Sequence, residues 1–148
     1  MYRKILVALE NSRADEAILA HIEPLARLMH SELVLVHVAD GWAARNLRQF
    51  NLAESEEMCE DRAYLERLCA GFAASGIPAE AVLLVGDPAD NIVRLAHETG
   101  ADLIAMGTHG HRFFGDLIYG STASAVRHAS RVPVLFLRAR AEPGAPGA

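Results

Sequence analysis

Five short apolar runs, separated by segments of helical length, constrain the fold of this 148-residue chain most strongly. Each run is rich in Val, Leu and Ile and shows little polar alternation, which is typical of strands buried on both faces of a parallel sheet. The runs occupy residues 5–9, 33–38, 81–85, 103–106 and 132–137. We therefore predict an α/β fold: a single domain with an open sheet of five mostly parallel strands and helices on both faces.

Apolar residues at helical spacing predict helices between these runs. The first helix is expected to follow Ser12, a candidate N-cap, and Pro24 should either kink it or shorten it. A second helix is expected within residues 54–75. Two further helices complete the alternation of strand and helix.

The third and fourth helices have recognisable ends. Asp87 is the predicted N-cap of the third helix, and Gly100 is expected to end it. The fourth helix is predicted to begin near Gly120 and to run to about His128. We expect residues 1–138 to form the domain and residues 139–148, which are rich in Pro and Gly, to form a disordered tail.

Composition excludes several classes of function. Hydrophobic residues make up 51% of the chain, and the formal net charge is −5. An acidic chain is a poor candidate for binding nucleic acid or anionic lipid, and no apolar run approaches the ~20 residues of a membrane span. Cys59 and Cys69 are expected about 15 Å apart on one helix, too far for a disulfide. These features predict a cytoplasmic protein with no nucleic-acid and no membrane partner.

A candidate phosphate site follows the fourth apolar run. Gly107 and Gly110 come directly after that run, and Gly120-Ser121 is expected to open a helix, whose unpaired amides attract anions. Lys4 is the only lysine, so the Walker P-loop is excluded, and the Gly-x-Gly-x-x-Gly fingerprint of dinucleotide-binding folds is missing after the first run. Two glycine-flanked backbone segments could hold phosphates without a lysine.

This spacing carries a resemblance to a known family. Gly107-x-x-Gly110, followed after nine residues by Gly120-Ser121, resembles the Gly-2x-Gly-9x-Gly-Ser/Thr nucleotide-binding motif of the universal stress protein family. The resemblance extends over nearly the whole chain, from the Ile-Leu-Val-Ala of the first run to the Arg-Val-Pro-Val-Leu of the last. Only the tail and the loop around Trp42 fall outside it.

The resemblance implies a cytoplasmic homodimer with sheet order 3-2-1-4-5 that binds ATP, or ADP, AMP or cyclic AMP, with Mg²⁺ accompanying the phosphates. It implies a stress-response or regulatory binding protein with no catalytic residue and no metal site of its own. Two alternatives remain: a slow ATPase or nucleotidyl-transfer enzyme on the same fold, and an interaction scaffold without a ligand. The alternation of Val134 and Phe136 with Leu135 and Leu137 leaves an apolar edge strand, which either a partner's last strand or an internal helix must cover.

Residue by residue, the resemblance assigns three parts of a nucleotide site. The adenine would lie against apolar residues, the ribose near a carboxylate, and the phosphates on the glycine segments. The residues implied are Ala8, Leu9, Val38 and Met106 for adenine, Glu10 and Gly107 for ribose, and Gly110, Gly120, Ser121 and Thr122 for the phosphates. His109 matches a family position beside the first glycine pair. Two departures are Glu10, where the family usually has Asp, and Ala123, where it often has Ser or Thr.

Three further interpretations depend on side chains near the same sheet edge. Arg112 either pairs with a phosphate or is a solvated surface residue. His37, His109 and His111, with carboxylates nearby, could hold a metal, although histidines that simply surround a pocket are favoured. Trp42 either closes over the pocket or covers an apolar edge, the second being favoured.

Overall fold

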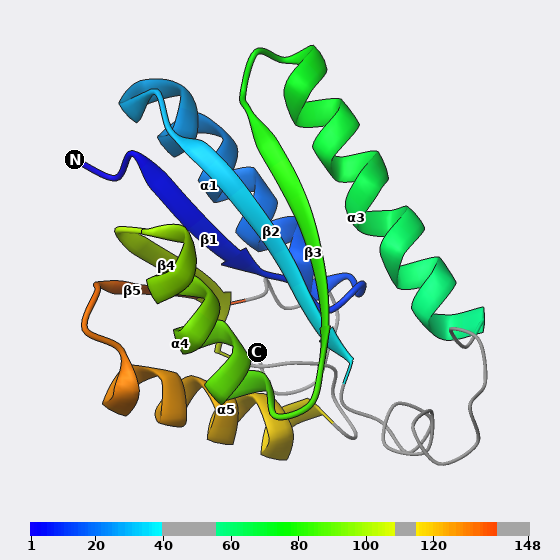
Figure 1. Cartoon of the computed structure of the whole chain (residues 1–148), viewed down its shortest axis with the longest axis vertical. Coiled ribbons are helices and arrows are strands. Elements are labelled where there is room, and N and C mark those ends of the chain that lie inside the picture. Colours follow the sequence, from blue (N-terminus) through cyan, green and yellow to red (C-terminus); the bar gives the residue numbers. More distant parts are fainter. Residues whose placement is uncertain (40–55, 109–114, 139–148) are drawn as a thin grey trace, which may run out of the picture.

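The computed structural model describes residues 1–39, 56–108 and 115–138, with the backbone alone for residues 115–119. Strands and helices alternate along these ranges, as predicted (Figure 1). The elements are β1 (Lys4–Ala8), α1 (Ala14–Met29), β2 (Glu32–Ala39), α3 (Glu56–Ala74), β3 (Ala79–Val85), α4 (Pro88–Thr99), β4 (Leu103–Gly107), α5 (Gly115–Ala129) and β5 (Val134–Leu137). Each predicted strand is present, with ends shifted by two residues or fewer.

The five strands form one parallel sheet in the order β3-β2-β1-β4-β5, which confirms the predicted topology. β1 is the central strand: Ile5 pairs with Leu33 of β2 on one side and with Leu103 of β4 on the other. The strand order reverses between β1 and β4. In open parallel sheets, ligands bind beyond the carboxyl ends of the strands at this kind of reversal.

The sheet separates two apolar layers (Figure 1). On one face, side chains such as Ile5 and Val7 pack with Ile18 of α1 and Leu65 of α3. On the other face, Leu6 packs with residues of α4 and α5. Successive residues of a strand point to opposite faces, and both faces of the sheet are covered. The buried stretches Ile5–Val7 and Leu33–Val36 are therefore apolar at every position.

The two edge strands are less buried than the sequence predicts. In β3, Glu80, Ala81 and Val85 are exposed, and all four residues of β5 are only half-buried. The expectation of burial on both faces is therefore wrong for β3 and β5, because each lies at an edge of the sheet with a neighbouring strand on one side alone. The predicted alternation in β5 is confirmed: Val134 and Phe136 pack on the α4/α5 side, and Leu135 and Leu137 on the other.

Helix α1 differs from expectation at its start and at Pro24. Its N-cap is Arg13, which makes no side-chain capping bond, although the Ser12 hydroxyl accepts a hydrogen bond from the Ala14 amide at 3.3 Å. The helix continues through Pro24 to Met29, so Pro24 does not shorten it. Helix α3 falls within the predicted range 54–75.

Helix α4 agrees with the sequence, whereas α5 begins earlier than predicted. The Asp87 carboxylate accepts a hydrogen bond from the Asp90 amide at 2.9 Å, and Gly100 ends α4 in a left-handed conformation. Helix α5 starts at Gly115, not near Gly120, so the prediction of its first turn is wrong. The apolar residues at 117–119 extend the helical pattern towards its N-terminus.

Some predictions concern residues outside the described ranges, namely Trp42, the residue pair His109 and His111, and the tail 139–148. Cys59 and Cys69 are both free thiols, as expected from their spacing. None of the helices in the described ranges has the length and apolar character that a membrane span requires.

Candidate functional site

A pocket lies at the carboxyl end of the sheet, where the strand order reverses. The ends of β1 and β4 form its floor, with contributions from β2 and from the start of α4. Its lining residues are Ala8, Leu9, Glu10, Val36, Val38, Pro88, Ile92, Met106 and Gly107. All but Glu10 and Gly107 are apolar, so the lining offers mainly apolar contacts together with one carboxylate.

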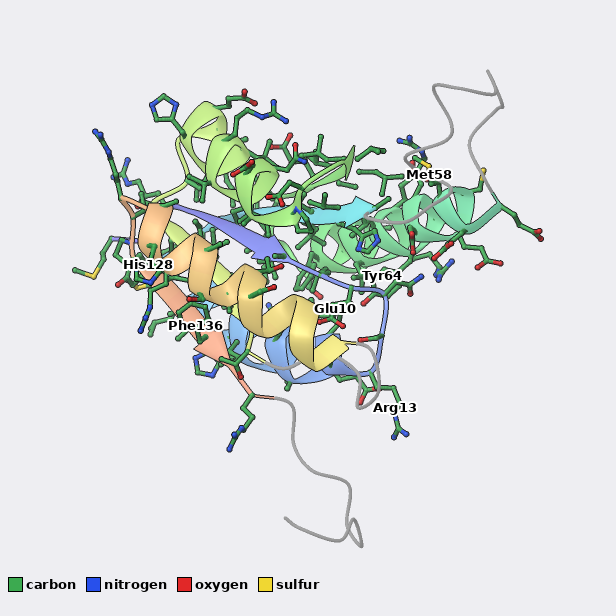
Figure 2. The ribbon with its side chains drawn as sticks, turned by 90° about the horizontal axis from the view of Figure 1, so that it is seen from below. Glu10, Arg13, Met58, Tyr64, His128 and Phe136 are labelled. Atoms are coloured by element: carbon green, nitrogen blue, oxygen red, sulfur yellow. The ribbon has the colours of Figure 1, made fainter. Side chains whose placement is uncertain are left out.

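Glu10 lies at the rim of this pocket, in the loop that joins β1 to α1 (Figure 2). Its side chain is half-buried, and its Oε2 accepts a hydrogen bond from the Ser12 hydroxyl at 3.1 Å. The next residue, Asn11, has a φ of 60°, in the left-handed region that few residues other than glycine and asparagine adopt. The loop therefore has a defined, tightly turned conformation.

The buried carboxylate of Asp15 holds this loop from below. Its Oδ1 accepts a hydrogen bond from the Glu10 amide at 3.0 Å, and its Oδ2 accepts one from the Asn11 amide at 2.9 Å. Asp15 is 0% exposed, and burial raises the pKa of its carboxyl, while its hydrogen bonds to Tyr64 and to the loop amides act in the opposite direction. These donors compensate a carboxylate that would otherwise be costly to bury.

Tyr64 brings helix α3 into the same network. Its hydroxyl donates to Oδ2 of Asp15 at 2.7 Å, and Figure 2 shows Tyr64 and Glu10 at the same end of the sheet. Burial, together with the neighbouring Asp15 carboxylate, raises the pKa of Tyr64 well above its ordinary value. The phenol therefore stays protonated and remains a donor at physiological pH.

His37 and Asp61 form a second buried connection between the strands and α3. His37 Nδ1 lies 2.8 Å from the Leu9 carbonyl oxygen, and Nε2 lies 3.2 Å from Oδ2 of Asp61. Both neighbours of the ring are hydrogen-bond acceptors. The other carboxylate oxygen of Asp61 accepts from Nδ2 of Asn11 at 3.0 Å. The residues on either side of Glu10 are thus both tied to this pair.

The opposite wall of the pocket depends on the turn between β3 and α4. Gly86 has a φ of 125°, and a Cβ there would lie 3.2 Å from Nδ2 of Asn91. That amide nitrogen donates to the Asp87 carbonyl at 2.8 Å. A glycine is required here, and the turn sets the position of Pro88, which lines the pocket.

The comparisons with known proteins agree with this geometry. A sequence model of the Universal stress protein family matches residues 1–138. The chain belongs to the universal stress protein family. A universal stress protein of Thermus aquaticus is 32% identical over 139 residues, which cover 93% of this chain and 100% of that protein.

Two archaeal relatives have solved structures. Universal stress protein MJ0577 of Methanocaldococcus jannaschii is 27% identical over 155 residues, covering 93% of this chain and 96% of that protein. The structure of MJ0577 has a TM-score of 0.82 at 28% identity, over 96% of this chain and 99% of that one. The Archaeoglobus fulgidus universal stress protein, solved in complex with dAMP, has a TM-score of 0.68 at 26% identity, over 92% and 98% of the two chains.

The pocket of this universal stress protein brings together half of the site residues implied by the sequence. They are the residues assigned to adenine and ribose: Ala8, Leu9, Glu10, Val38, Met106 and Gly107. His109, Gly110 and Arg112 lie outside the described residues. Gly120, Ser121 and Thr122 lie within α5 and are not among the residues that line the pocket.

The position of Gly120 within α5 differs from the predicted helix start. Because the helix begins at Gly115, an amide at position 120 has an intrahelical acceptor four residues earlier, and the unpaired amides belong to the turn before it. Ser121 is exposed, whereas Thr122 is 6% exposed. The expectation that Gly120-Ser121 opens the helix is therefore wrong for this conformation.

The metal hypothesis receives no support from His37, which contacts the Leu9 carbonyl and Asp61 instead. Among the described residues, no group of His, Cys, Asp and Glu is arranged to hold a metal ion. His109 and His111 lie outside that part of the chain.

Several residues of the site are absent from the sequence-based expectations. Val36, Pro88 and Ile92 line the pocket, and the strand ends and the Asp87-Pro88 helix start could have indicated them. No local sequence pattern indicates the buried network of Asp15, Asp61 and Tyr64. In the sequence these are ordinary polar residues of predicted helices, and their contacts depend on how the helices pack.

Proposed function

We propose that this universal stress protein binds an adenine nucleotide, ATP in the first instance, in the pocket at the carboxyl end of the sheet. The observation that carries the proposal is the pocket's position across the reversal of strand order between β1 and β4, where this class of sheet binds ligands. The dAMP complex of the Archaeoglobus fulgidus relative supports the adenine part.

The adenine ring would contact the apolar part of the pocket lining. That part consists of Ala8, Leu9, Val36, Val38, Ile92 and Met106. Apolar contact with a base is worth about 25 cal/mol for each Å² removed from water, so this region can supply much of the affinity. Glu10 and Gly107, at the polar rim, would face the ribose.

The phosphate part of the proposal rests on the motif Gly107-x-x-Gly110 and Gly120-Ser121. Those glycines would approach the phosphates with their backbone amides, and Mg²⁺ would accompany the phosphate oxygens. For Gly120 to contribute an amide, the turn of α5 before it must be open in the complex, because in the present conformation α5 begins at Gly115.

The proposed role is regulatory nucleotide binding in the stress response, in the cytoplasm. The protein would act as a homodimer whose two copies pair through β5. The four half-buried residues of β5 form an apolar edge of the sheet, which the second copy would cover. A ligand acts in such a protein through its different affinities for two conformations.

Calorimetric titration with Mg-ATP tests the proposal. We expect wild-type protein to bind ATP, and we expect the pocket-filling variant Ala8→Leu to lose at least tenfold in affinity, because the added isobutyl group occupies the adenine position. Ala81→Leu, a matched change at an exposed strand position, should bind like the wild type. Absence of ATP binding by the wild type would refute the proposal, and several turnovers per minute of ATP to ADP would favour an enzyme instead.

A further inference from the structure

The loop that carries Glu10 is held by a buried carboxylate, that of Asp15 on α1. Asp15 accepts hydrogen bonds from the amides of Glu10 and Asn11, and it also makes a backbone hydrogen bond with Ser12. A single buried carboxylate thus fixes three consecutive peptide units. A loop residue between two such fixed amides has little freedom to change its backbone direction.

The side chain of Glu10 is fixed as well. Its Oε2 accepts the Ser12 hydroxyl at 3.1 Å, and Ser12 is itself held by the Ala14 amide at 3.3 Å. Glu10 is one of the residues that line the pocket, and the oxygens of a carboxylate accept hydrogen bonds. Ribose hydroxyls are donors of the right kind.

Tyr64 completes the support from α3. Its hydroxyl donates to Oδ2 of Asp15, the same oxygen that accepts from the Asn11 amide. Because α3 supplies this donor, the position of Asp15 depends on a helix that does not line the pocket among its described residues. Asp61, also on α3, holds Asn11 by its side chain.

We propose that Asp15 and Tyr64 are positioning residues for Glu10, and that they enable Glu10 to recognise the ribose hydroxyls of the bound nucleotide. This inference rests on the proposed function and names its specificity: the site distinguishes nucleotides by their sugar hydroxyls. Removing the Tyr64 hydroxyl weakens that recognition and leaves the adenine contacts intact, because none of the apolar lining residues changes.

The experiment compares the affinities of Mg-ATP and Mg-2′,3′-dideoxy-ATP, measured by calorimetry. For the wild type we expect ATP to bind about tenfold more tightly, the factor that corresponds to one ordinary hydrogen bond. Tyr64→Phe should reduce this ratio to about two by weakening ATP alone, with the affinity for the dideoxy analogue unchanged. Tyr2→Phe, a matched loss of a hydroxyl beyond the opposite end of β1, should keep the wild-type ratio.

A double variant separates positioning from general structural damage. In a Glu10→Ala background, Tyr64→Phe should have no further effect on the ratio, because the group that it positions is gone. The inference would be overturned if Tyr64→Phe lowered the affinities for ATP and for dideoxy-ATP equally. It would also be overturned if the wild type bound the two nucleotides with nearly equal affinity. In both cases the proposed function would stand. Binding of neither nucleotide by the wild type would overturn the proposed function itself. If Tyr64→Phe fails to fold, Asp15→Asn provides the same test, because it keeps one acceptor oxygen and removes the charge that holds the amides of Glu10 and Asn11.

Discussion

The hydroxyl of Tyr64, on α3, donates a 2.7 Å hydrogen bond to the carboxylate of Asp15, on α1, whose side chain has no exposed surface. This bond joins two helices that cover the same face of the sheet. It also lies beneath the loop that carries Glu10, so the stability of the fold and the shape of the pocket rim depend on the same atoms.

Tyr64→Phe should destabilise the protein more at neutral pH than in acid. Burial raises the pKa of Asp15 in the folded state above its value of 3.8 in the unfolded chain. The carboxyl's contribution to stability is therefore fully present below 3.8 and declines as the pH rises through the folded pKa. The Tyr64 hydroxyl offsets that decline by stabilising the ionised form. We expect a loss of about 2 kcal/mol at pH 7, the range for a hydrogen bond to a charged group.

Urea unfolding at a series of pH values measures this difference. The loss should shrink below pH 3.8, where the carboxyl is protonated in both states. In parallel, the pKa of Asp15 followed by carboxyl NMR should rise in Tyr64→Phe, since the variant lacks a group that lowers it. A loss independent of pH would show that the hydroxyl does not act through the Asp15 charge.

His37→Phe should cost about 2 kcal/mol of unfolding free energy, the middle of the range for leaving a buried hydrogen-bonding group without its partner. The substitution leaves the buried Asp61 without its His37 partner and removes the contact with the Leu9 carbonyl. Thermal or urea unfolding measures the effect. His97→Phe, at an exposed position on α4, is the control and should change stability little.

Gly86→Ala should destabilise the fold by about 2 kcal/mol, because the backbone at φ 125° strains any side chain and the new Cβ lies 3.2 Å from Asn91 Nδ2. Gly71→Ala is the matched control: Gly71 lies within α3, and a Cβ there meets nothing within 4 Å. That change should stabilise by about 0.5 to 1 kcal/mol through helix propensity. Equal effects at both positions would contradict the strained turn at Gly86.

Gly120→Val should abolish the contribution of the phosphates to ATP binding, with affinity falling to that of adenosine. A Cβ at Gly120 meets nothing within 4 Å in the ligand-free protein, so the variant should fold, and a branched side chain would then stand where the phosphates are proposed to approach. Calorimetry with ATP and with adenosine measures the two affinities. Gly71→Val, on α3, makes the same change far from the motif and should bind normally. Full ATP affinity in Gly120→Val would remove Gly120 from the site.

Leu135→Lys should convert the proposed dimer to a monomer. A charge on β5 would oppose pairing of this apolar edge with a second copy, and lysine is a common means of blocking edge strands. Sedimentation equilibrium measures the mass in solution. Val85→Lys places the same charge on β3, at the other edge of the sheet, and should leave a dimer. A monomeric wild type would show that β5 does not form the interface.

The sheet could be predicted from the sequence because its signal is local: each strand is a short apolar run, and the order of runs and helices limits the topology. The position of the pocket at the strand ends could be predicted in the same way. The assignment of its residues to adenine and ribose came from the family resemblance and stays a prediction. The predicted start of α5 near Gly120 is wrong because a glycine is typical of a helix boundary, whereas this helix extends back to Gly115.

The polar network beneath the loop could not be predicted in the same way. Asp15 meets Tyr64, and Asn11 meets Asp61, only after α1 and α3 have packed on one face of the sheet. Asp15 lies in the first turn of its helix, where an acidic residue has an ordinary explanation in the helix dipole. The local sequence pattern does not distinguish an exposed Asp that interacts with the helix dipole from an Asp whose carboxylate is buried.

The central position of β1 has a consequence for synthesis. Ile5 pairs with Leu33 early in the chain and with Leu103 much later. Contacts between residues so far apart in sequence form slowly and late. While the chain is being translated, its central strand therefore keeps one side unpaired until the segment around Leu103 has left the ribosome, and in that interval the exposed strand edge favours aggregation.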